Sequence, residues 1–456
     1  MYIIIVSAGV IGSRVAAMLV KEGHDVVVID ESEIALDSLS LRLDVKTVVG
    51  SPINPQVQLE ADVSSADVIV AVTRHDELNI ITCFIAKELG ARKTVAKIQN
   101  LDYPGYFIGP ASSPNAPRRI VRPKKLGVDL LINPEAMTAQ HILNTLSSLF
   151  ITPTESLSDG LVQIAEFEVE REVVTNIPLR HLDFSKPARI IAIVREKDNI
   201  IPDDDDVLEL KDHVFVISTP ANMNEIGKMF SRPLKPAKSI VIAGGGAIGF
   251  HLAQELEKLG THVKIIEKDM QRCQEIAKKL NKTLIIQGEV TSQDYLRDEG
   301  VASADAFVAA ANRDELNILI SLLAKNLGSV RSLAVVNRPE YMSLAKATGI
   351  DFAISPLLLA GNELARFIHQ SRVLSAASLA DGKTEALEFL VQPDSPVVGQ
   401  HVKDIEFPKK AILGAIVRKS KVIIPQSDDI IEQEDRVILV GFQSFMPNAE
   451  KIFEHR

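Results

Sequence analysis

The 456-residue chain has no tryptophan and only two cysteines. Cys83 and Cys273 have no cysteine or histidine companion close by, which excludes a disulfide framework and a zinc cluster and favours a reducing compartment. No apolar run approaches the roughly 18 residues that span a bilayer. The N-terminus enters an apolar run at once, without the basic start of a signal peptide. We therefore expect a cytosolic protein.

Positive charge is also scarce, since 50 Lys and Arg residues stand against 60 Asp and Glu residues and leave a net charge of −10. A broad nucleic-acid surface needs a basic field, so no nucleic-acid partner is expected. Hydrophobic residues make up 46% and charged residues 24% of the chain, as in globular proteins with several cores. Disorder, collagen and coiled coil are excluded as its main character.

The sequence does contain an internal duplication. The run from Ile5 to Gly12 resembles the run from Ile242 to Gly249. Asp-Glu-Leu-Asn at 76–79 recurs at 314–317, and Ala-Ile-Val-Arg at 192–195 recurs at 415–418. These repeats predict two copies of a two-part module, with domains at 1–150, 151–232, 238–373 and 374–456. The proline-rich stretch between Arg232 and Pro236 is typical of a linker.

The first part of each copy alternates short β-rich runs with amphipathic stretches. In the second copy, strands are predicted at 239–243, 262–266, 283–286, 305–310, 332–336 and 351–354. Runs that are apolar on successive residues, such as 306–309, favour a parallel sheet covered on both faces. Strands alternating with helices predict right-handed βαβ crossovers. The expected fold class is α/β, with two Rossmann-like doubly wound parallel-sheet domains.

The second part of each copy is expected to be a small strand-rich domain. Both copies repeat an Arg after an apolar run, a proline, an acidic residue in a turn and another apolar run. The residues that share this pattern are Arg195, Pro202 and Asp212 in the first copy, and Arg418, Pro425 and Asp435 in the second.

A glycine-rich turn opens the second copy and carries its chemistry. Gly244, Gly246 and Gly249 follow a predicted strand and begin a predicted helix. One glycine permits the tight turn, the next lets the backbone approach a pyrophosphate, and the third allows close helix packing. Glu267 would bind the adenosine ribose hydroxyls and disfavour NADP. The alternative is a set of purely structural glycines in a fold without a ligand.

The first copy departs from this pattern at one position. Ser7 stands where the first glycine should be, and its Cβ strains the turn unless the backbone keeps an ordinary conformation. Gly9, Gly12 and Asp30 remain in place at the same spacing. The first copy is therefore interpreted either as a second nucleotide site or as a degenerate scaffold.

Other candidates follow later strands, at the carboxyl edge where such sheets bind ligands. Thr73 and Arg74 have Ala311 and Asn312 as counterparts, so the two sites should differ chemically. Lys97 could reach a terminal phosphate or be a solvated strand end, and its counterpart is a valine. The full set of candidate nucleotide-binding residues is Ser7, Ala8, Gly9, Val10, Ile11, Gly12, Asp30, Gly50, Ser51, Thr73, Arg74, Lys97, Gly244, Gly245, Gly246, Ala247, Ile248, Gly249, Glu267, Gly288 and Glu289.

Several conspicuous features favour ordinary structural explanations. The two Asp-Glu-Leu-Asn runs open helices, so N-terminal capping and complementation of the helix dipole are preferred over ligand contact. Four successive aspartates at 203–206 suit a solvated turn better than a cation site. The ten histidines have no metal-ligand spacing. An extra segment between Pro104 and Arg119 in the first copy is expected to be a mobile loop, with an interaction arm as the alternative.

The order of these parts resembles the TrkA family of Trk-type potassium uptake regulators over nearly the whole chain. The resemblance rests on the two glycine turns, on Thr73 and 76–79, on 312–317, and on both small modules. It implies RCK/KTN nucleotide-binding domains, each followed by a TrkA-C domain, and binding of NAD(H) and, in some members, ATP and ADP. It also implies a homotetrameric ring on the inner face of the membrane, beneath a TrkH-type potassium transporter. Ser7, Ser51, Glu289 and the segment at 104–119 depart from the family pattern.

The residues themselves favour sensing over catalysis. An oxidoreductase needs a general acid or base near the nicotinamide, and no His/Asp or Lys constellation is evident in the small domains. The working hypothesis is a non-enzymatic regulatory subunit whose nucleotides bias a membrane potassium transporter. The alternatives are a regulator of another cation channel or antiporter and an NAD-dependent oxidoreductase.

Overall fold

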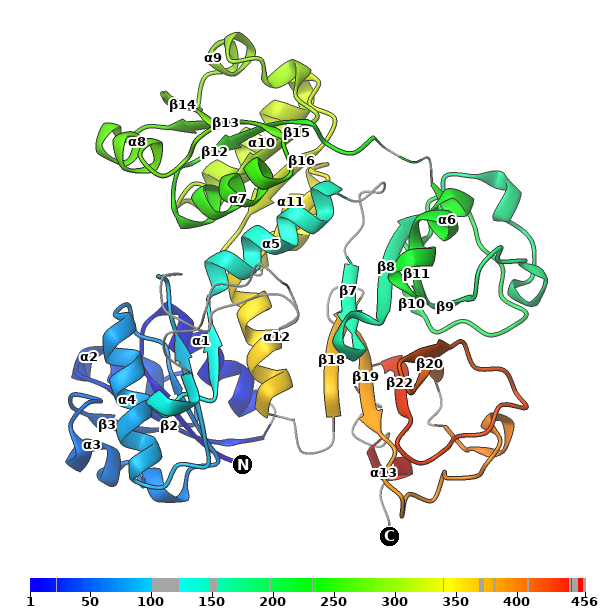
Figure 1. Cartoon of the computed structure of the whole chain (residues 1–456), viewed down its shortest axis with the longest axis horizontal. Coiled ribbons are helices and arrows are strands. Elements are labelled where there is room, and N and C mark those ends of the chain that lie inside the picture. Colours follow the sequence, from blue (N-terminus) through cyan, green and yellow to red (C-terminus); the bar gives the residue numbers. More distant parts are fainter. Residues whose placement is uncertain are drawn as a thin grey trace. The chain divides into compact units, whose positions relative to one another are not determined.

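The computed structural model describes residues 1–21, 23–100, 123–147, 154–196, 198–231, 233, 235–338, 340–368, 373–379, 383–407, 410–442, 444 and 450–453. The segment between Pro104 and Arg119 lies outside the described residues. Within them the strands form four sheets, two of six strands and two of five (Figure 1). The chain separates into two compact units, one made of 1–138 with 356–364 and the other of 139–355 with 365–456.

Two six-stranded parallel sheets confirm the predicted α/β class. The first has the order β3-β2-β1-β4-β5-β6 and the second the order β14-β13-β12-β15-β16-β17. Their strands are β1 (Tyr2–Val6), β2 (Asp25–Asp30), β3 (Lys46–Val49), β4 (Val68–Ala71), β5 (Lys93–Lys97), β6 (Leu130–Ile132), β12 (Ser239–Ala243), β13 (His262–Glu267), β14 (Leu284–Gln287), β15 (Ala306–Ala309), β16 (Ser332–Val335) and β17 (Phe352–Ile354). The six strands predicted for the second copy are all confirmed, with ends that differ by no more than one residue.

Helices follow the strands as the alternating pattern predicted. They are α1 (Val10–Lys21), α2 (Glu33–Ser40), α3 (Pro55–Glu60), α4 (Asp76–Glu88), α7 (Ala247–Lys258), α8 (Met270–Ala277), α9 (Gln293–Asp298), α10 (Asp314–Leu327) and α11 (Glu340–Ala347). Every residue of β4 and β15 is buried, as expected for strands covered on both faces. The strand order reverses between β1 and β4 and between β12 and β15, and folds of this kind bind ligands at the carboxyl edge beside such a reversal.

Two helices are exchanged between the copies. The first part of α12 (Pro356–Ile368), which follows the second sheet in the chain, belongs to the unit that contains the first sheet. There the Cβ position of Gly361 lies 3.5 Å from Sδ of Met18 on α1. The part of α5 (Pro134–Ser147) after Thr138, which follows the first sheet, belongs to the unit of the second sheet. The ring of His141 on α5 lies 6.4 Å from that of Phe352 on β17.

A buried arginine holds the end of α5. Arg331, just before β16, is 1% exposed, and its Nη1 donates to the carbonyl of Leu146 at 2.8 Å. Its Nη2 donates to the carbonyl of Lys235 at 2.9 Å. Burial lowers the pKa of Arg331. The last carbonyls of a helix have no partner within it and carry partial negative charge, so the guanidinium stabilises this helix end.

The small domains are two antiparallel sheets of the same topology. Their orders are β10-β9-β11-β8-β7 and β18-β19-β22-β20-β21. The elements are β7 (Thr154–Leu157), β8 (Val162–Glu168), β9 (Ala188–Arg195), β10 (Asp198–Ile200), β11 (His213–Ser218), α6 (Pro220–Phe230), β18 (Val373–Leu379), β19 (Thr384–Leu390), β20 (Ala411–Arg418), β21 (Lys421–Ile423), β22 (Arg436–Phe442) and α13 (Glu450–Phe453). One buried apolar cluster takes Leu157 and Ile191 from the first sheet and Ala415 and Ile438 from the second, so the two sheets share a core.

The repeated Arg and Asp of the small domains form buried ion pairs. Nε and Nη2 of Arg195 donate to the two carboxylate oxygens of Asp212 at 2.9 and 2.8 Å. Arg418 holds Asp435 in the same way at 2.8 and 2.7 Å. The two aspartates are 1% and 0% exposed. The guanidiniums therefore tie the acidic turns before β11 and β22 to the ends of β9 and β20.

Glu257 on α7 offers a test of pH-dependent stability in the second copy. Its carboxylate accepts hydrogen bonds from the N–H groups of Lys282 and Thr283, both at 2.7 Å, and from the Thr283 hydroxyl at 2.8 Å. Partial burial opposes ionisation, but these hydrogen bonds lower the pKa of Glu257 overall. A carboxyl with a lowered pKa stabilises the fold above its unfolded pKa, and this contribution is lost as the pH falls. We expect Glu257→Gln to reduce the free energy of unfolding by about 1 kcal/mol at pH 7, since the group is partly solvated.

Urea denaturation of both proteins at pH 7 and pH 3.5 would measure this difference. The wild-type advantage should shrink at the lower pH. An advantage of the same size at both pH values would show that the charge of Glu257 contributes nothing.

Candidate nucleotide-binding sites

The glycine turn between β12 and α7 requires glycine at two positions for its own packing. Gly244 has φ +112°, and a Cβ there would lie 2.6 Å from the carbonyl oxygen of Ala310. A Cβ on Gly249 would lie 2.1 Å from the carbonyl oxygen of Gly244. Gly246 differs, because the nearest atom to its Cβ position is Oδ1 of Asn312 at 4.0 Å. Glycine at 246 therefore leaves open space beside the first turn of the helix, where a ligand would approach the backbone.

The acidic residue at the end of β13 clamps this turn. One carboxylate oxygen of Glu267 accepts the N–H of Gly245 at 2.7 Å and the other accepts the N–H of Asp269 at 2.9 Å. The carboxylate thus lies beside the glycine turn at the carboxyl edge, the place from which such residues reach a ribose. Ala247 and Ile248 form the first turn of α7.

The first turn keeps the same geometry in spite of its serine. Ser7 has φ +105°, a strained conformation for a residue with a side chain. Its Oγ accepts the N–H of Gly9 at 3.1 Å, while Asp30 accepts the N–H groups of Ala8 at 2.7 Å and Ser32 at 2.8 Å. A Cβ on Gly12 would lie 1.8 Å from the Ser7 carbonyl oxygen. Two backbone donors of this turn, the N–H groups of Ala8 and Gly9, are therefore already engaged by side chains.

The glycines after the third strands have a packing reason of their own. Gly50 has φ +154°, and its Cβ position lies 2.6 Å from Cγ2 of Val57 on α3. A Cβ on Gly288 would lie 1.8 Å from the Tyr295 hydroxyl on α9. The N–H groups of Gly50 and Gly288 donate to the carbonyls of Asp30 and Glu267, so these turns and the adjoining Ser51 and Glu289 lie at the same sheet edges as the acidic clamps.

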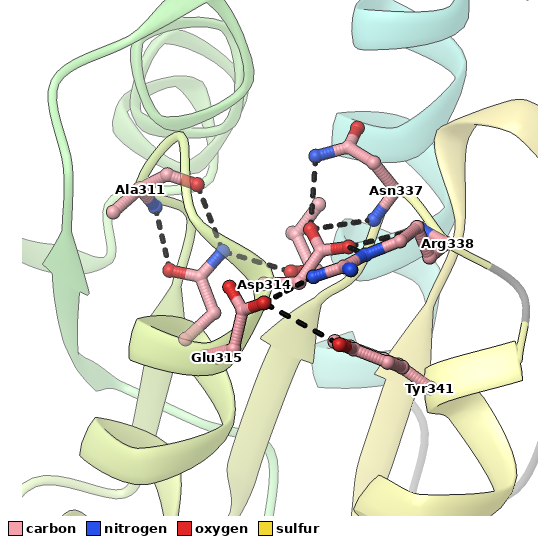
Figure 2. Close-up of polar contacts among 8 residues, drawn as sticks. Ala311, Asp314, Glu315, Asn337, Arg338 and Tyr341 are labelled. Carbon is pink, nitrogen blue, oxygen red and sulfur yellow. Dashed lines mark hydrogen bonds and ion pairs between the residues drawn. The ribbon is translucent and has the colours of Figure 1, made fainter. Parts of the chain in front are cut away.

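The Asp-Glu-Leu-Asn runs place two acidic residues in the first turn of each helix, as expected for dipole complementation, but their Asp and Asn side chains also tie neighbouring loops together, which capping did not predict. The N-cap positions of α4 and α10 are His75 and Arg313, and neither makes a side-chain cap. Asp76 instead accepts the N–H groups of Gln99 and Asn100 after β5, at 2.8 to 3.0 Å. In the second copy, Asp314 accepts those of Asn337 and Arg338 after β16, at 2.8 and 3.0 Å (Figure 2).

The asparagines of these runs add a second tie. Asn79 accepts the Thr73 N–H at 2.9 Å and hydroxyl at 2.7 Å, and donates to the Lys97 carbonyl at 2.9 Å. Asn317 makes the matching bonds to the N–H of Ala311 at 2.9 Å and the carbonyl of Val335 at 2.8 Å. The loops after the fourth and fifth strands are therefore fixed to each other on one edge of each sheet. Sequence alone fits capping equally well, because Asp and Asn at a helix start are the usual capping residues.

Lys97 is buried at the end of β5. It is 4% exposed, so the expectation of a solvated strand end is wrong. Within the described part of the chain, no acidic side chain pairs with its ammonium group. A lysine that is largely buried is costly to keep charged, and an anionic ligand at this edge would reduce that cost. Val335 occupies the matching position in the second copy, while Arg74 is exposed.

Arg338 is a residue of this edge that sequence reasoning missed. Its guanidinium stacks on the Tyr341 ring at 3.9 Å and lies 3.3 Å from Asp314, and it also pairs with Glu315 (Figure 2). Hydrogen bonding to Glu315 raises the pKa of Arg338. Asn100 stands at the matching position in the first copy. The sequence did offer a signal for Arg338, because the residue comes shortly after the fifth strand of the second sheet, within reach of Asp314.

Neither a metal centre nor a membrane span emerges from the residues that the structure describes. They include no group of three or more His, Cys, Asp or Glu side chains arranged to hold a metal ion. None of their helices is long and apolar enough to cross a membrane. In the run of four aspartates, the N–H groups of Asp203 and Asp205 donate to the carboxylates of Asp206 and Asp203, and Asp205 also pairs with Arg180.

Comparison with known proteins gives the same two-part repeat. The model of the TrkA-N domain matches residues 3–134 and 240–356, and that of the TrkA-C domain matches residues 164–231 and 386–453. The chain is 32% identical to Trk system potassium uptake protein TrkA homolog 2 of Methanosarcina mazei over 460 residues, which cover 99% of each chain. It is also 32% identical to the TrkA protein of Halomonas elongata over 465 residues, which cover 100% of this chain and 99% of that one.

Solved structures with the same architecture include the GsuK channel bound to NAD. It superimposes with a TM-score of 0.64 at 18% identity and covers 99% of this chain and 78% of that one. The GsuK RCK domain gives a TM-score of 0.63 at 18% identity, with 99% of this chain and 94% of that one covered. At this identity the likeness establishes the fold.

Proposed function

Because this chain belongs to the TrkA family of Trk system potassium uptake proteins, we propose that it is the nucleotide-binding regulatory subunit of such a system. In this role it works on the cytoplasmic side of the membrane, as a homo-oligomer attached to an integral-membrane potassium transporter. A tetramer and a TrkH-type transporter are the assembly that we propose for it. The domain boundaries predicted from the repeats belong to the same proposal.

The observation that carries the proposal is the glycine turn of the second copy. Gly244 and Gly249 are needed for packing, whereas glycine at 246 serves only to leave space beside the backbone at the start of α7. An N-terminal helix turn with free space in front of it suits a pyrophosphate, because its N–H groups and partial positive charge face the ligand. Glu267 lies beside the same turn and can bind ribose hydroxyls.

The ligands proposed are NAD(H) at both turns and ATP or ADP where a phosphate partner is present. Asp30 and Glu267 suit the ribose of an adenine nucleotide at the first and second sites. The buried Lys97 suits a terminal phosphate at the first site only, since Val335 replaces it at the second. The remaining candidate residues at the two sheet edges are proposed to contact the ligand through their backbone groups. In this proposal the bound nucleotide acts as a regulatory ligand and takes part in no bond-breaking chemistry.

Regulation then follows from differential binding. If a nucleotide binds one arrangement of the assembly more tightly than the other, it shifts the equilibrium of the attached transporter. A coupling free energy of about 1–3 kcal/mol would be typical, and transporter binding must change nucleotide affinity by the same factor. The loops tied by Asn79 and Asn317 lie at the same sheet edges as the proposed sites.

Titration calorimetry with NADH, ATP and ADP would test the proposal on the full chain. We expect saturable binding with the nucleotide recovered intact, and weakened binding at the second site in Gly246→Val, which fills the open space. The absence of binding by any nucleotide would overturn the nucleotide-sensing role. Steady consumption of NADH would overturn the non-enzymatic role.

Lys97 allows the first site to be tested separately. Lys97→Met removes the charge but keeps the length of the side chain, so we expect the fold to persist. ATP affinity at the first site should fall by about tenfold, the typical value of a lost charge-assisted contact, while NADH affinity changes little. Equilibrium binding of both nucleotides measures this, with Lys46→Met at the exposed start of β3 as the matched control. Equal losses for ATP and NADH would contradict a role for Lys97 in holding a terminal phosphate.

A further inference from the structure

The two glycine turns differ in the partner of one carbonyl group. In the first turn, the carbonyl of Ala8 accepts the hydroxyl of Ser13 at 2.8 Å. In the second, the matching carbonyl of Gly245 accepts Nε of Arg272 at 2.7 Å. Phe250 stands at the position of Ser13, and its ring lies 5.8 Å from the guanidinium of Arg272. The second copy has therefore exchanged a neutral partner for a cation.

The charges around the two acidic clamps differ in the same direction. In the first copy, Asp30 is followed by Glu31 and Glu33, both exposed, and the counterpart of Arg272 is Ala35. In the second copy, Glu267 is followed by the exposed Lys268. The first site thus presents three carboxylates at its ribose end, and the second presents acidic and basic groups together.

Arg272 remains available to a ligand where it lies. Its side chain is 34% exposed, and its Nη1 pairs with Glu275 at 3.0 Å, an exposed residue on the same helix. A second cation lies near the same ring, since Nζ of Lys279 is 5.8 Å from the centre of the Phe250 ring. A ligand phosphate could replace the solvated Glu275 without disturbing the bond from Nε to Gly245, because a guanidinium has five donors.

We propose that Arg272 is a specificity-determining residue that lets the second site accept an adenosine 2′-phosphate, as in NADP(H), which the first site rejects. The acidic residue at the end of the second strand is the group that faces the ribose 2′ position, and a nearby arginine is what accommodates a phosphate there. Glu267 alone would repel that phosphate, and the fixed positive charge of Arg272 offsets the repulsion. The first site has no cation in the matching position. This inference rests on the proposed nucleotide-binding function and refines the NADP exclusion expected from Glu267.

Stoichiometry gives the first test on the full-length protein. NADH should saturate two sites per chain, and NADPH one. In a Gly12→Ala background, which disables the first site, NADPH binding should persist. NADPH binding at neither site, together with NADH binding at both, would overturn this proposal and leave the proposed function intact. No binding of NADH, ATP or ADP at either site would instead overturn the proposed function.

Substitution of Arg272 gives the second test. Arg272→Ala should weaken NADPH binding at the second site by about tenfold, which is the size of a lost charge-assisted contact. NADH binding should change by less than about threefold. Arg272→Lys keeps the charge and should retain NADPH binding. Arg297→Ala, which removes another exposed arginine of the same domain, serves as the matched control. Equal weakening of NADH and NADPH in Arg272→Ala would show that the residue only supports the turn, and would overturn the proposal.

Discussion

Replacement of Gly249 by alanine is expected to abolish nucleotide binding at the second site. The new Cβ would lie 2.1 Å from the carbonyl oxygen of Gly244, an atom of the backbone that cannot move without opening the turn. We expect affinity for NADH at this site to fall by roughly 100-fold or more, with a loss of about 1–3 kcal/mol in the stability of the domain from overpacking. Calorimetry on the full chain would show this as the loss of one binding site per chain.

A matched Gly→Ala change separates this effect from the general cost of substitution. Gly361 lies in α12, and its Cβ position meets Sδ of Met18 at 3.5 Å, an ordinary contact. Gly361→Ala should therefore keep both sites. Retention of full NADH stoichiometry in Gly249→Ala, with unchanged affinity, would contradict the idea that this turn holds the ligand.

The second large effect is expected from the buried ion pair of the last small domain. Asp435→Ala would leave the guanidinium of Arg418 without the carboxylate that binds it through two hydrogen bonds, and would also free the Glu432 N–H that Asp435 accepts at 2.8 Å. Asp435 is buried, but Arg418 is 26% exposed and keeps Glu432 as a partner, so the expected cost is that of lost charge-assisted hydrogen bonds, about 1.5–3 kcal/mol. Urea denaturation monitored by circular dichroism should show the midpoint of the affected transition moving to lower urea.

An exposed ion pair of the same domain supplies the control. Lys403 and Asp428 lie 2.7 Å apart, with both side chains largely solvated. Such pairs contribute little, so Asp428→Ala should leave the transition in place. If Asp435→Ala also left it in place, the repeated Arg and Asp would not be what closes the acidic turns, and the same substitution at Asp212 should then be equally silent.

The repeats carried most of what the sequence could predict. Apolar runs on successive residues led to strands within one residue of those observed in the second copy, because burial on both faces leaves a clear mark in composition. The glycine turns were equally readable, since only glycine fits where Gly249 approaches Gly244. The family follows from the order of these parts.

Other features leave no mark in a single sequence. The periodicity of α12 shows which face is apolar but not which sheet that face will cover, so the exchange of α5 and α12 could not be foreseen. The loop ties made by Asp76 and Asn79 were missed because a capping residue and a loop tie have the same sequence signal. The burial of Lys97 was missed because lysine at a strand end is ordinarily solvated.

The exchanged helices have a consequence for how this chain arose and how it could be divided. Each half of the chain supplies one helix to the unit built around the other half, and the small domains share a core. Two identical half-length chains with the same exchange would form a symmetric pair, so the fusion of two such subunits accounts for the present arrangement. A proteolytic nick in the linker near Pro233 should leave two fragments that remain bound to each other, whereas either half expressed by itself would lack a helix that completes its sheet.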